Sequence, residues 1–115
     1  MIVDDSDVMR VFIRNILIRA GHEIVAEART GSQAISSYKI YKPDIVTMDI
    51  NMPDMNGLMV LKEILRESPN AKIIMITALD QKLTIYEALK SGAVNYILKP
   101  IQADKVLSVI EEALH

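Results

Sequence analysis

The sequence predicts an α/β fold in which helices cover both faces of a parallel sheet. Five short apolar runs alternate along the chain with segments whose apolar residues recur at helical spacing. The runs are nearly continuous in apolar residues, which is typical of parallel strands that are buried on both faces. The connections between them are short. Together these observations indicate a doubly wound, five-stranded parallel sheet with five helices.

The expected strands are short and rich in β-branched and other apolar residues. They are residues 1–3, 22–28, 44–49, 72–77 and 94–98. The first is shorter than the ~5–6 residues that are usual for a strand, so we expect further residues to precede Met1. Pro43 introduces the third strand, and the dipeptide Lys99-Pro100 closes the fifth.

The expected helices have recognisable first and last residues. They are residues 6–20, 30–42, 57–67, 81–91 and 103–114. Ser6 and Thr30 carry hydroxyls that can cap the first two helices, and Gly21 and Gly92 follow the first and fourth. The apolar stripe that we expect the first helix to bury comprises Met9, Phe12, Ile13, Ile16, Leu17 and Ala20.

Composition limits the classes of protein to which the chain can belong. A length of 115 residues with 50% hydrophobic residues suits one domain, which we expect to span 1–115. The absence of cysteine excludes disulfides and thiolate sites. A net charge of −2 gives no reason to expect direct nucleic-acid binding, and no apolar run approaches the ~20 residues of a membrane span. We expect a cytoplasmic protein without a membrane partner.

Polar side chains end four of the five expected strands. Asp4 and Asp5 follow the first, Asp49 ends the third, Thr77 ends the fourth and Lys99 follows the fifth. The carboxyl ends of parallel strands meet at one edge, where ligands bind in open α/β sheets. Three adjacent carboxylates repel one another unless a cation lies among them, and Mg²⁺ prefers such oxygen ligands. The set indicates phosphoryl transfer with a carboxylate as the nucleophile.

Each of these residues also has an ordinary structural interpretation. An aspartate after a strand often caps a helix or makes a turn, and we assign Asp54, within Pro-Asp-Met-Asn-Gly, to a turn. Thr77 can cap the following helix, and a lysine before a proline is usually solvated. A phosphoryl-transfer site is predicted because these acids, the hydroxyl and the lysine occur together at four strand ends, in the charge balance that such a site needs.

Four motifs resemble the response-regulator receiver domain of two-component signalling. They are Val3-Asp4-Asp5-Ser6, the segment 49–57, Thr77-Ala78 and Lys99-Pro100. The resemblance covers the whole chain and implies a flavodoxin-like sheet with strand order 2-1-3-4-5, the order that is known for this family. It also implies either a single-domain regulator of the chemotaxis type or a receiver from a larger protein.

The resemblance assigns a metal-assisted phosphorylation site. Asp49 is similar to the phosphate acceptor of the family. Asp5 and Asp49 match direct Mg²⁺ ligands, Asn51 would contribute its backbone carbonyl, and Asp4 would act through water. Mg²⁺ is therefore the expected cofactor.

Three further positions match residues that respond to the phosphoryl group. Lys99 resembles the residue that pairs with it, over a Lys99-Pro100 bond that is cis in the family. Thr77 and Tyr96 match the two switch positions, one a hydroxyl and the other an aromatic ring.

The expected function is a phosphorylation-activated signalling switch. The resemblance implies phosphoryl transfer from a sensor histidine kinase or a phosphotransfer protein, and a downstream protein target on the face of the fourth helix, fifth strand and fifth helix. The chain would be a regulator, not an enzyme, and would catalyse only its own phosphorylation and slow dephosphorylation. Val8, Val11 and Ile18 lie outside the expected stripe of the first helix and suggest a second partner surface.

Three other classes of protein share parts of this pattern. A binding module that had lost phosphorylation would not need the complete set of acids, Thr77 and Lys99. A haloacid-dehalogenase-like hydrolase requires an acid two residues after the nucleophile, where this chain has Asn51. A flavin carrier would need a hydroxyl-rich phosphate loop after the first strand, and an absorbance spectrum would reveal the flavin.

Overall fold

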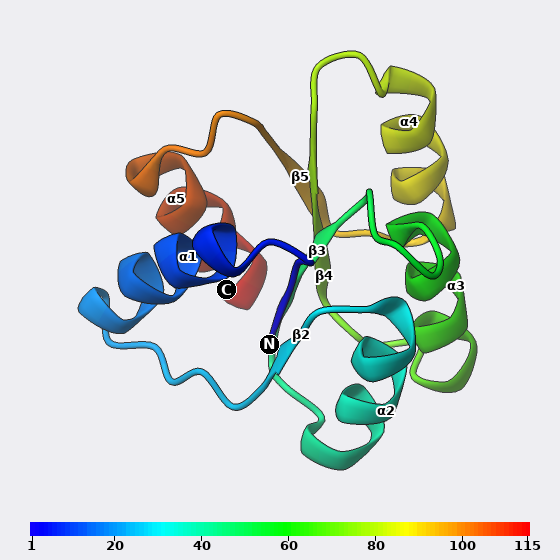
Figure 1. The fold of residues 1–115 in the computed structure, drawn as a ribbon, viewed down its shortest axis with the longest axis horizontal. Helices are drawn as coiled ribbons and strands as arrows, with labels where there is room; N and C mark the ends of the chain where they lie inside the picture. The colour runs from blue at the N-terminus through cyan, green and yellow to red at the C-terminus, as the bar shows by residue number, and fades with distance from the viewer.

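A five-stranded parallel sheet forms the centre of the computed structural model, which describes all 115 residues (Figure 1). The strands are β1 Ile2–Val3, β2 Glu27–Ala28, β3 Val46–Asp49, β4 Ile73–Thr77 and β5 Asn95–Leu98. Their order is β2-β1-β3-β4-β5, which confirms the predicted topology.

Helices lie in two layers, one on each side of the sheet. They are α1 Asp7–Arg19, α2 Gly31–Tyr41, α3 Gly57–Glu67, α4 Lys82–Ser91 and α5 Ala103–Leu114. Figure 1 shows α1 and α5 on one face and α2, α3 and α4 on the other. None of them combines the length and apolar character that a membrane-spanning helix needs.

Two apolar clusters fill the space between the sheet and these layers. Val3, Met48 and Met75 point towards α2, α3 and α4, whereas Ile74 and Ile97 point towards α1 and α5. Successive side chains of a strand point to opposite faces, so a continuous apolar run supplies both clusters. All five side chains are almost completely buried. Burial of each contributes about 1.5–3 kcal/mol, which fixes the strand ends in place.

Helix starts follow the residues that can cap them. The side chains of Ser6 and Thr30 accept hydrogen bonds from the backbone N–H groups of Met9 and Gln33, which confirms the predicted caps. Asn56 caps α3 in the same way. Each cap satisfies an N–H that has no partner within its helix.

Two predictions about packing were wrong. The strand expected over 22–28 is reduced to Glu27–Ala28, because β2 pairs only with the two-residue β1. Before Glu27, only Ala26 bonds to β1, through its carbonyl, which accepts from the N–H of Ile2. Phe12 and Ala20, both expected in the buried stripe of the first helix, are exposed. The buried stripe of α1 is rotated away from Phe12, and Arg10 takes the opposite margin, where its guanidinium donates to the carbonyl of Asp4.

Candidate functional site

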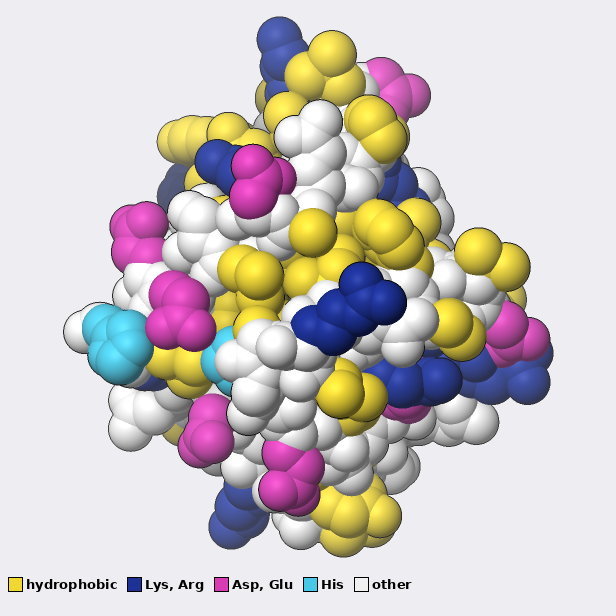
Figure 2. Space-filling model, turned by 90° about the vertical axis from the view of Figure 1, so that its left-hand side faces the viewer, with side chains coloured by type: hydrophobic (Ala, Val, Ile, Leu, Met, Phe, Trp, Pro, Cys, Tyr) yellow, Lys and Arg dark blue, Asp and Glu magenta, His cyan; other side chains and the backbone are white.

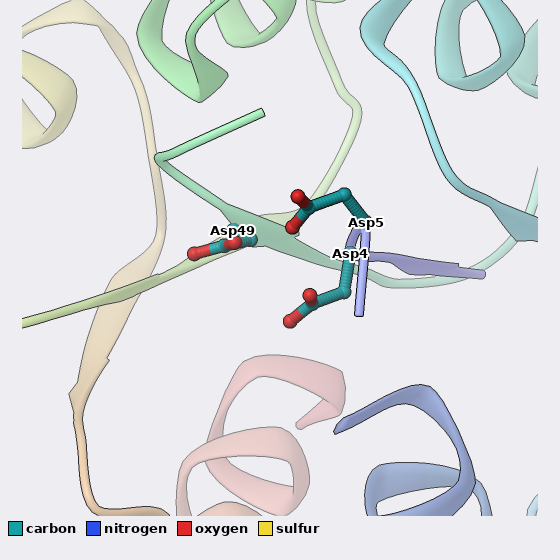
Figure 3. Close-up of side chains that lie close together, drawn as sticks. All are labelled: Asp4, Asp5 and Asp49. Carbon is teal, nitrogen blue, oxygen red and sulfur yellow. The ribbon is translucent and has the colours of Figure 1, made fainter. Parts of the chain in front are cut away.

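Three carboxylates lie together at the carboxyl edge of the sheet. Oxygen atoms of Asp4, Asp5 and Asp49 all lie within 4.8 Å of one another. Figure 3 shows them gathered where β1 and β3 end. The register explains how Asp4 and Asp49 meet, because Val3 pairs with Met48 and an aspartate follows each of these two residues in the chain. The cluster predicted from the strand ends is therefore present.

Burial makes this cluster electrostatically unfavourable without a cation. Asp4 and Asp49 are almost fully buried, and desolvation raises the pKa of both carboxyls above their usual range. The charge and hydrogen bond of Lys99 act in the opposite direction on the pKa of Asp49, as does the backbone N–H of Asn51. Burial outweighs these contributions, so the ionised cluster is costly in the metal-free protein.

One buried oxygen of the cluster has no hydrogen-bond partner. Oδ1 of Asp4 accepts from the backbone N–H of Ser6 at 2.9 Å, but the buried Oδ2 has none. A buried acceptor without a partner costs free energy, and a divalent cation or its bound water would satisfy it. Oxygen ligands and surplus negative charge both suit Mg²⁺. The residues therefore fit this ion.

Lys99 places a positive charge against the acidic cluster. Its Nζ lies 3.1 Å from Oδ1 of Asp49, and its backbone N–H donates to the carbonyl of Thr77 at 2.8 Å. The Lys99–Pro100 peptide bond is cis. The side chain of Lys99 is 32% exposed, whereas that of Asp49 is 4% exposed. The ammonium group can thus contact both Asp49 and an anion that arrives from solvent.

Thr77 ends the neighbouring strand β4, and its hydroxyl is directed to Gln81. Oγ1 of Thr77 donates to Oε1 of Gln81 at 2.9 Å and lies 3.3 Å from the carbonyl oxygen of Ala78. The Gln81 amide also exchanges hydrogen bonds with the side chain of Asn51, at 3.2 and 3.4 Å. Tyr96 lies on β5 and is 36% exposed. No pattern in the sequence singles out Gln81, because a glutamine at the start of a helix is common.

Asp54 does more than make the predicted turn. Its carboxylate accepts hydrogen bonds from the backbone N–H groups of Gly31 and Ser32, at 2.8 and 3.0 Å, and from the Ser32 hydroxyl at 2.9 Å. The backbone donors of Gly31 and Ser32 lower the pKa of Asp54 to about 2. The loop after Asp49 is therefore fastened to the start of α2, a contact that no short-range pattern in the sequence indicates.

Gly57 allows the same loop to fold closely against the end of β3. Its N–H donates to the carbonyl of Ile50 at 2.6 Å. A Cβ at this position would lie 2.4 Å from the carbonyl oxygen of Asp49, closer than nonbonded atoms approach. The backbone on either side of Asp49 is thus held by packing as well as by hydrogen bonds.

Replacing Asp4 with Asn is expected to raise the free energy of unfolding of the metal-free protein by about 1 kcal/mol, because it removes one of three clustered charges. A raised pKa means that the folded state binds a proton more readily than the unfolded chain. Stability due to Asp4 therefore rises as pH falls through the folded pKa towards 3.8, and is lost above it. The variant should lack this contribution.

Urea unfolding in chelator at pH 7 measures the difference, with Asp80→Asn, an exposed acid outside the cluster, as the control. A less stable Asp4→Asn protein would contradict the electrostatic account. Added Mg²⁺ should stabilise the wild type more than Asp4→Asn.

Comparisons with known proteins agree on one family. A family model described as the response regulator receiver domain matches residues 1–111. The chain is 47% identical over 115 residues to chemotaxis protein CheY of Bacillus subtilis, covering 100% of this chain and 96% of the relative. It is 46% identical over 112 residues to CheY of Thermotoga maritima, covering 97% and 93%.

Solved structures give the same result. A CheX-CheY-BeF3-Mg+2 complex from Borrelia burgdorferi contains a chain with TM-score 0.94 and 36% identity, covering 99% of this chain and 87% of that one. The response regulator domain of Thermotoga maritima CheB gives a TM-score of 0.91 at 34% identity, covering 98% and 92%.

Proposed function

The chain belongs to the response regulator receiver domain family and is a phosphorylation-activated switch of two-component signalling, and we propose that Asp49 is the residue that accepts the phosphoryl group. We also propose that residues 1–115 form one receiver domain. The observation that carries the assignment of Asp49 is its position between the ammonium group of Lys99 and the carboxylates of Asp4 and Asp5. It is buried at a strand end, 3.1 Å from Lys99 and next to Asp4 and Asp5.

Asp49 is suited to act as a nucleophile on phosphorus. One carboxylate oxygen attacks the phosphorus atom, a new P–O bond forms, and the bond to the leaving group breaks, with its electron pair remaining on that group. The Lys99 ammonium remains beside the product and pairs with its phosphoryl oxygens. Burial of Asp49 excludes water from one side of the acyl phosphate. In this proposal the chain catalyses only its own phosphorylation and slow dephosphorylation.

The metal would be held by Asp4, Asp5, Asp49 and the backbone carbonyl of Asn51. When bound, Mg²⁺ supplies positive charge that offsets the repulsion between the carboxylates and an anionic donor. The partnerless Oδ2 of Asp4 supports this assignment, as do the raised pKa values of Asp4 and Asp49. The contribution of this chain is to fix the three carboxylates at one point of the sheet edge.

The switch that we propose uses Thr77 and Tyr96. Thr77 can donate its hydroxyl proton to a phosphoryl oxygen on Asp49, because β4 lies directly beside β3. Tyr96 sits on β5 next to Met75 of β4, with its ring partly exposed. A shift of Thr77 would change the space beside α4 into which the Tyr96 ring can turn.

Two exposed apolar surfaces are suited to protein partners. Leu83 and Tyr86 of α4 are exposed, Leu83 to 82%, and Leu98 of β5 is exposed as well, which fits a downstream target. On α1, Val8 is 80% exposed, and Ile18 is also exposed, which suits a sensor histidine kinase or phosphotransfer protein. Figure 2 views the molecule from the side of α1 and α5 and shows apolar side chains interspersed with charged ones. With these partners, we propose that the switch acts in the cytoplasm.

The direct test is incubation with acetyl phosphate followed by intact mass measurement. With Mg²⁺ present, the protein should gain one phosphoryl group. With excess chelator, uptake should fall at least about tenfold, because the uncompensated carboxylates repel the donor. Full uptake in chelator would show that the acidic cluster does not act through a metal ion.

A further inference from the structure

Gln81 occupies the N-cap position of α4 but does not cap that helix. Its side chain makes no hydrogen bond to the first turn of α4. The amide oxygen instead accepts the hydroxyl proton of Thr77 at 2.9 Å, and the amide nitrogen donates to Oδ1 of Asn51 at 3.2 Å. One side chain thus joins the ends of β3 and β4 to the beginning of α4.

The hydroxyl of Thr77 has a single proton to donate. Its shorter contact is to Gln81, the contact to the carbonyl of Ala78 is longer at 3.3 Å, and no hydrogen bond joins it to Asp49. A phosphoryl group on Asp49 can receive this proton only if Gln81 gives it up. The two acceptors therefore compete for one donor.

We propose that Gln81 is a positioning residue that holds Thr77 in the resting conformation and so opposes activation. The inference rests on the proposed roles of Asp49 and Thr77, and it adds a residue that restrains them. Gln81 is half-buried and follows Thr77 by only four residues, through Ala78, Leu79 and Asp80. The Gln81 side chain can therefore change its conformation when Thr77 moves.

The same contact ties the start of α4 to the phosphorylation site. The carbonyl of Gln81 accepts a hydrogen bond from the N–H of Ile85 and so closes the first turn of α4. The N–H of Gln81 donates to the carbonyl of Ala78. When Thr77 turns to the phosphoryl group, the link between its side chain and this turn is lost. Release of Gln81 is therefore a direct route from Asp49 to α4.

Loss of the Gln81 contact should favour the active arrangement. A neutral, partly solvated hydrogen bond makes a modest net contribution to the resting state, so its removal should shift the equilibrium about three- to tenfold. A ligand that prefers the active arrangement then binds more tightly by the same factor while the resting state still dominates. Beryllofluoride, a stable mimic of the phosphoryl group, is such a probe.

The experiment is a beryllofluoride titration in saturating Mg²⁺, followed by amide NMR shifts, on wild type and Gln81→Leu. Leucine has a similar length but offers neither donor nor acceptor. The apparent affinity should rise about three- to tenfold. Gln102→Leu is the matched control, because Gln102 holds the N-cap position of α5 and also lacks a capping side-chain hydrogen bond. It should bind beryllofluoride as the wild type does.

A second pair of proteins separates this role from a general effect on α4. In a Thr77→Ala background, Gln81→Leu should change the affinity by less than about twofold, because the hydrogen bond to Thr77 is already absent and only the exposed contact with Asn51 is lost. Gln81→Ala replaces Gln81→Leu in both backgrounds if the leucine variant does not fold.

Unchanged or weaker binding by the single variant would overturn the proposal. An equal gain in the Thr77→Ala background would overturn it as well, since Gln81 would then act without Thr77. A wild-type protein that binds no beryllofluoride would count against the phosphorylation site itself and not against Gln81 alone.

Discussion

Replacing Asp49 with Asn is expected to reduce phosphoryl uptake from acetyl phosphate at least roughly a hundredfold, a loss of about 3 kcal/mol in transition-state stabilisation. The amide has nearly the same shape as the carboxylate but lacks the nucleophilic anionic oxygen. The loss should not come from unfolding. Asp49 lies in the charged cluster, and removal of its charge relieves the repulsion that makes the metal-free cluster costly. The partly exposed Lys99 can then turn to solvent.

Intact mass over time measures the uptake, and Asp54→Asn is the matched control. Asp54 belongs to the same loop, but its carboxylate is exposed and accepts from the start of α2. An asparagine there keeps one acceptor oxygen, so uptake should remain within about threefold of wild type. Uptake by Asp49→Asn at the wild-type rate would show that another residue accepts the group.

The acidic cluster was predictable because strand geometry brings its members together. Apolar runs indicated the strands, and parallel strands place the residues that follow them at one edge. Asp4 and Asp49 therefore meet although 45 positions separate them, and Lys99 reaches Asp49 from the end of β5 for the same reason. The pattern of apolar runs specifies which residues end the strands, and this is sufficient to predict that their side chains meet at one edge of the sheet.

The contacts made by loops were not predictable in this way. Gln81 and Asp54 both reach partners on other connections, and no periodicity fixes where a loop side chain points. The same limit applies to the margins of a helix. Phe12 and Arg10 lie at the two sides of the α1 stripe, and it is Arg10 that is buried, where it pairs with Glu27 of β2 and donates to the carbonyl of Asp4. These two partners are tertiary neighbours that the sequence does not reveal.

Thr77→Ala is expected to leave Asp49 phosphorylatable while uncoupling it from α4 and β5. The hydroxyl is the only donor in the side chain of Thr77, and alanine removes it without adding bulk. Coupling between two sites of a protein is typically worth ~1–3 kcal/mol, and one hydrogen bond together with the burial of an aromatic ring is of that size. Loss of the hydroxyl can therefore remove most of the response.

Amide NMR shifts of α4 and β5, with and without beryllofluoride, measure the coupling. In the wild type, amides around Tyr96 should shift when the probe binds at Asp49. In Thr77→Ala, those near Asp49 should still shift while those around Tyr96 stay close to their resting values. Thr77→Ser keeps the hydroxyl and should restore the response, which separates the loss of a donor from the loss of a buried methyl group. Equal shifts around Tyr96 in Thr77→Ala and wild type would show that the signal leaves Asp49 by a route that does not include Thr77. Thr77→Ala also removes the hydrogen bond between Thr77 and Gln81. If the amides around Tyr96 in this variant are already shifted towards the active state without beryllofluoride, release of Gln81 is by itself sufficient to move them.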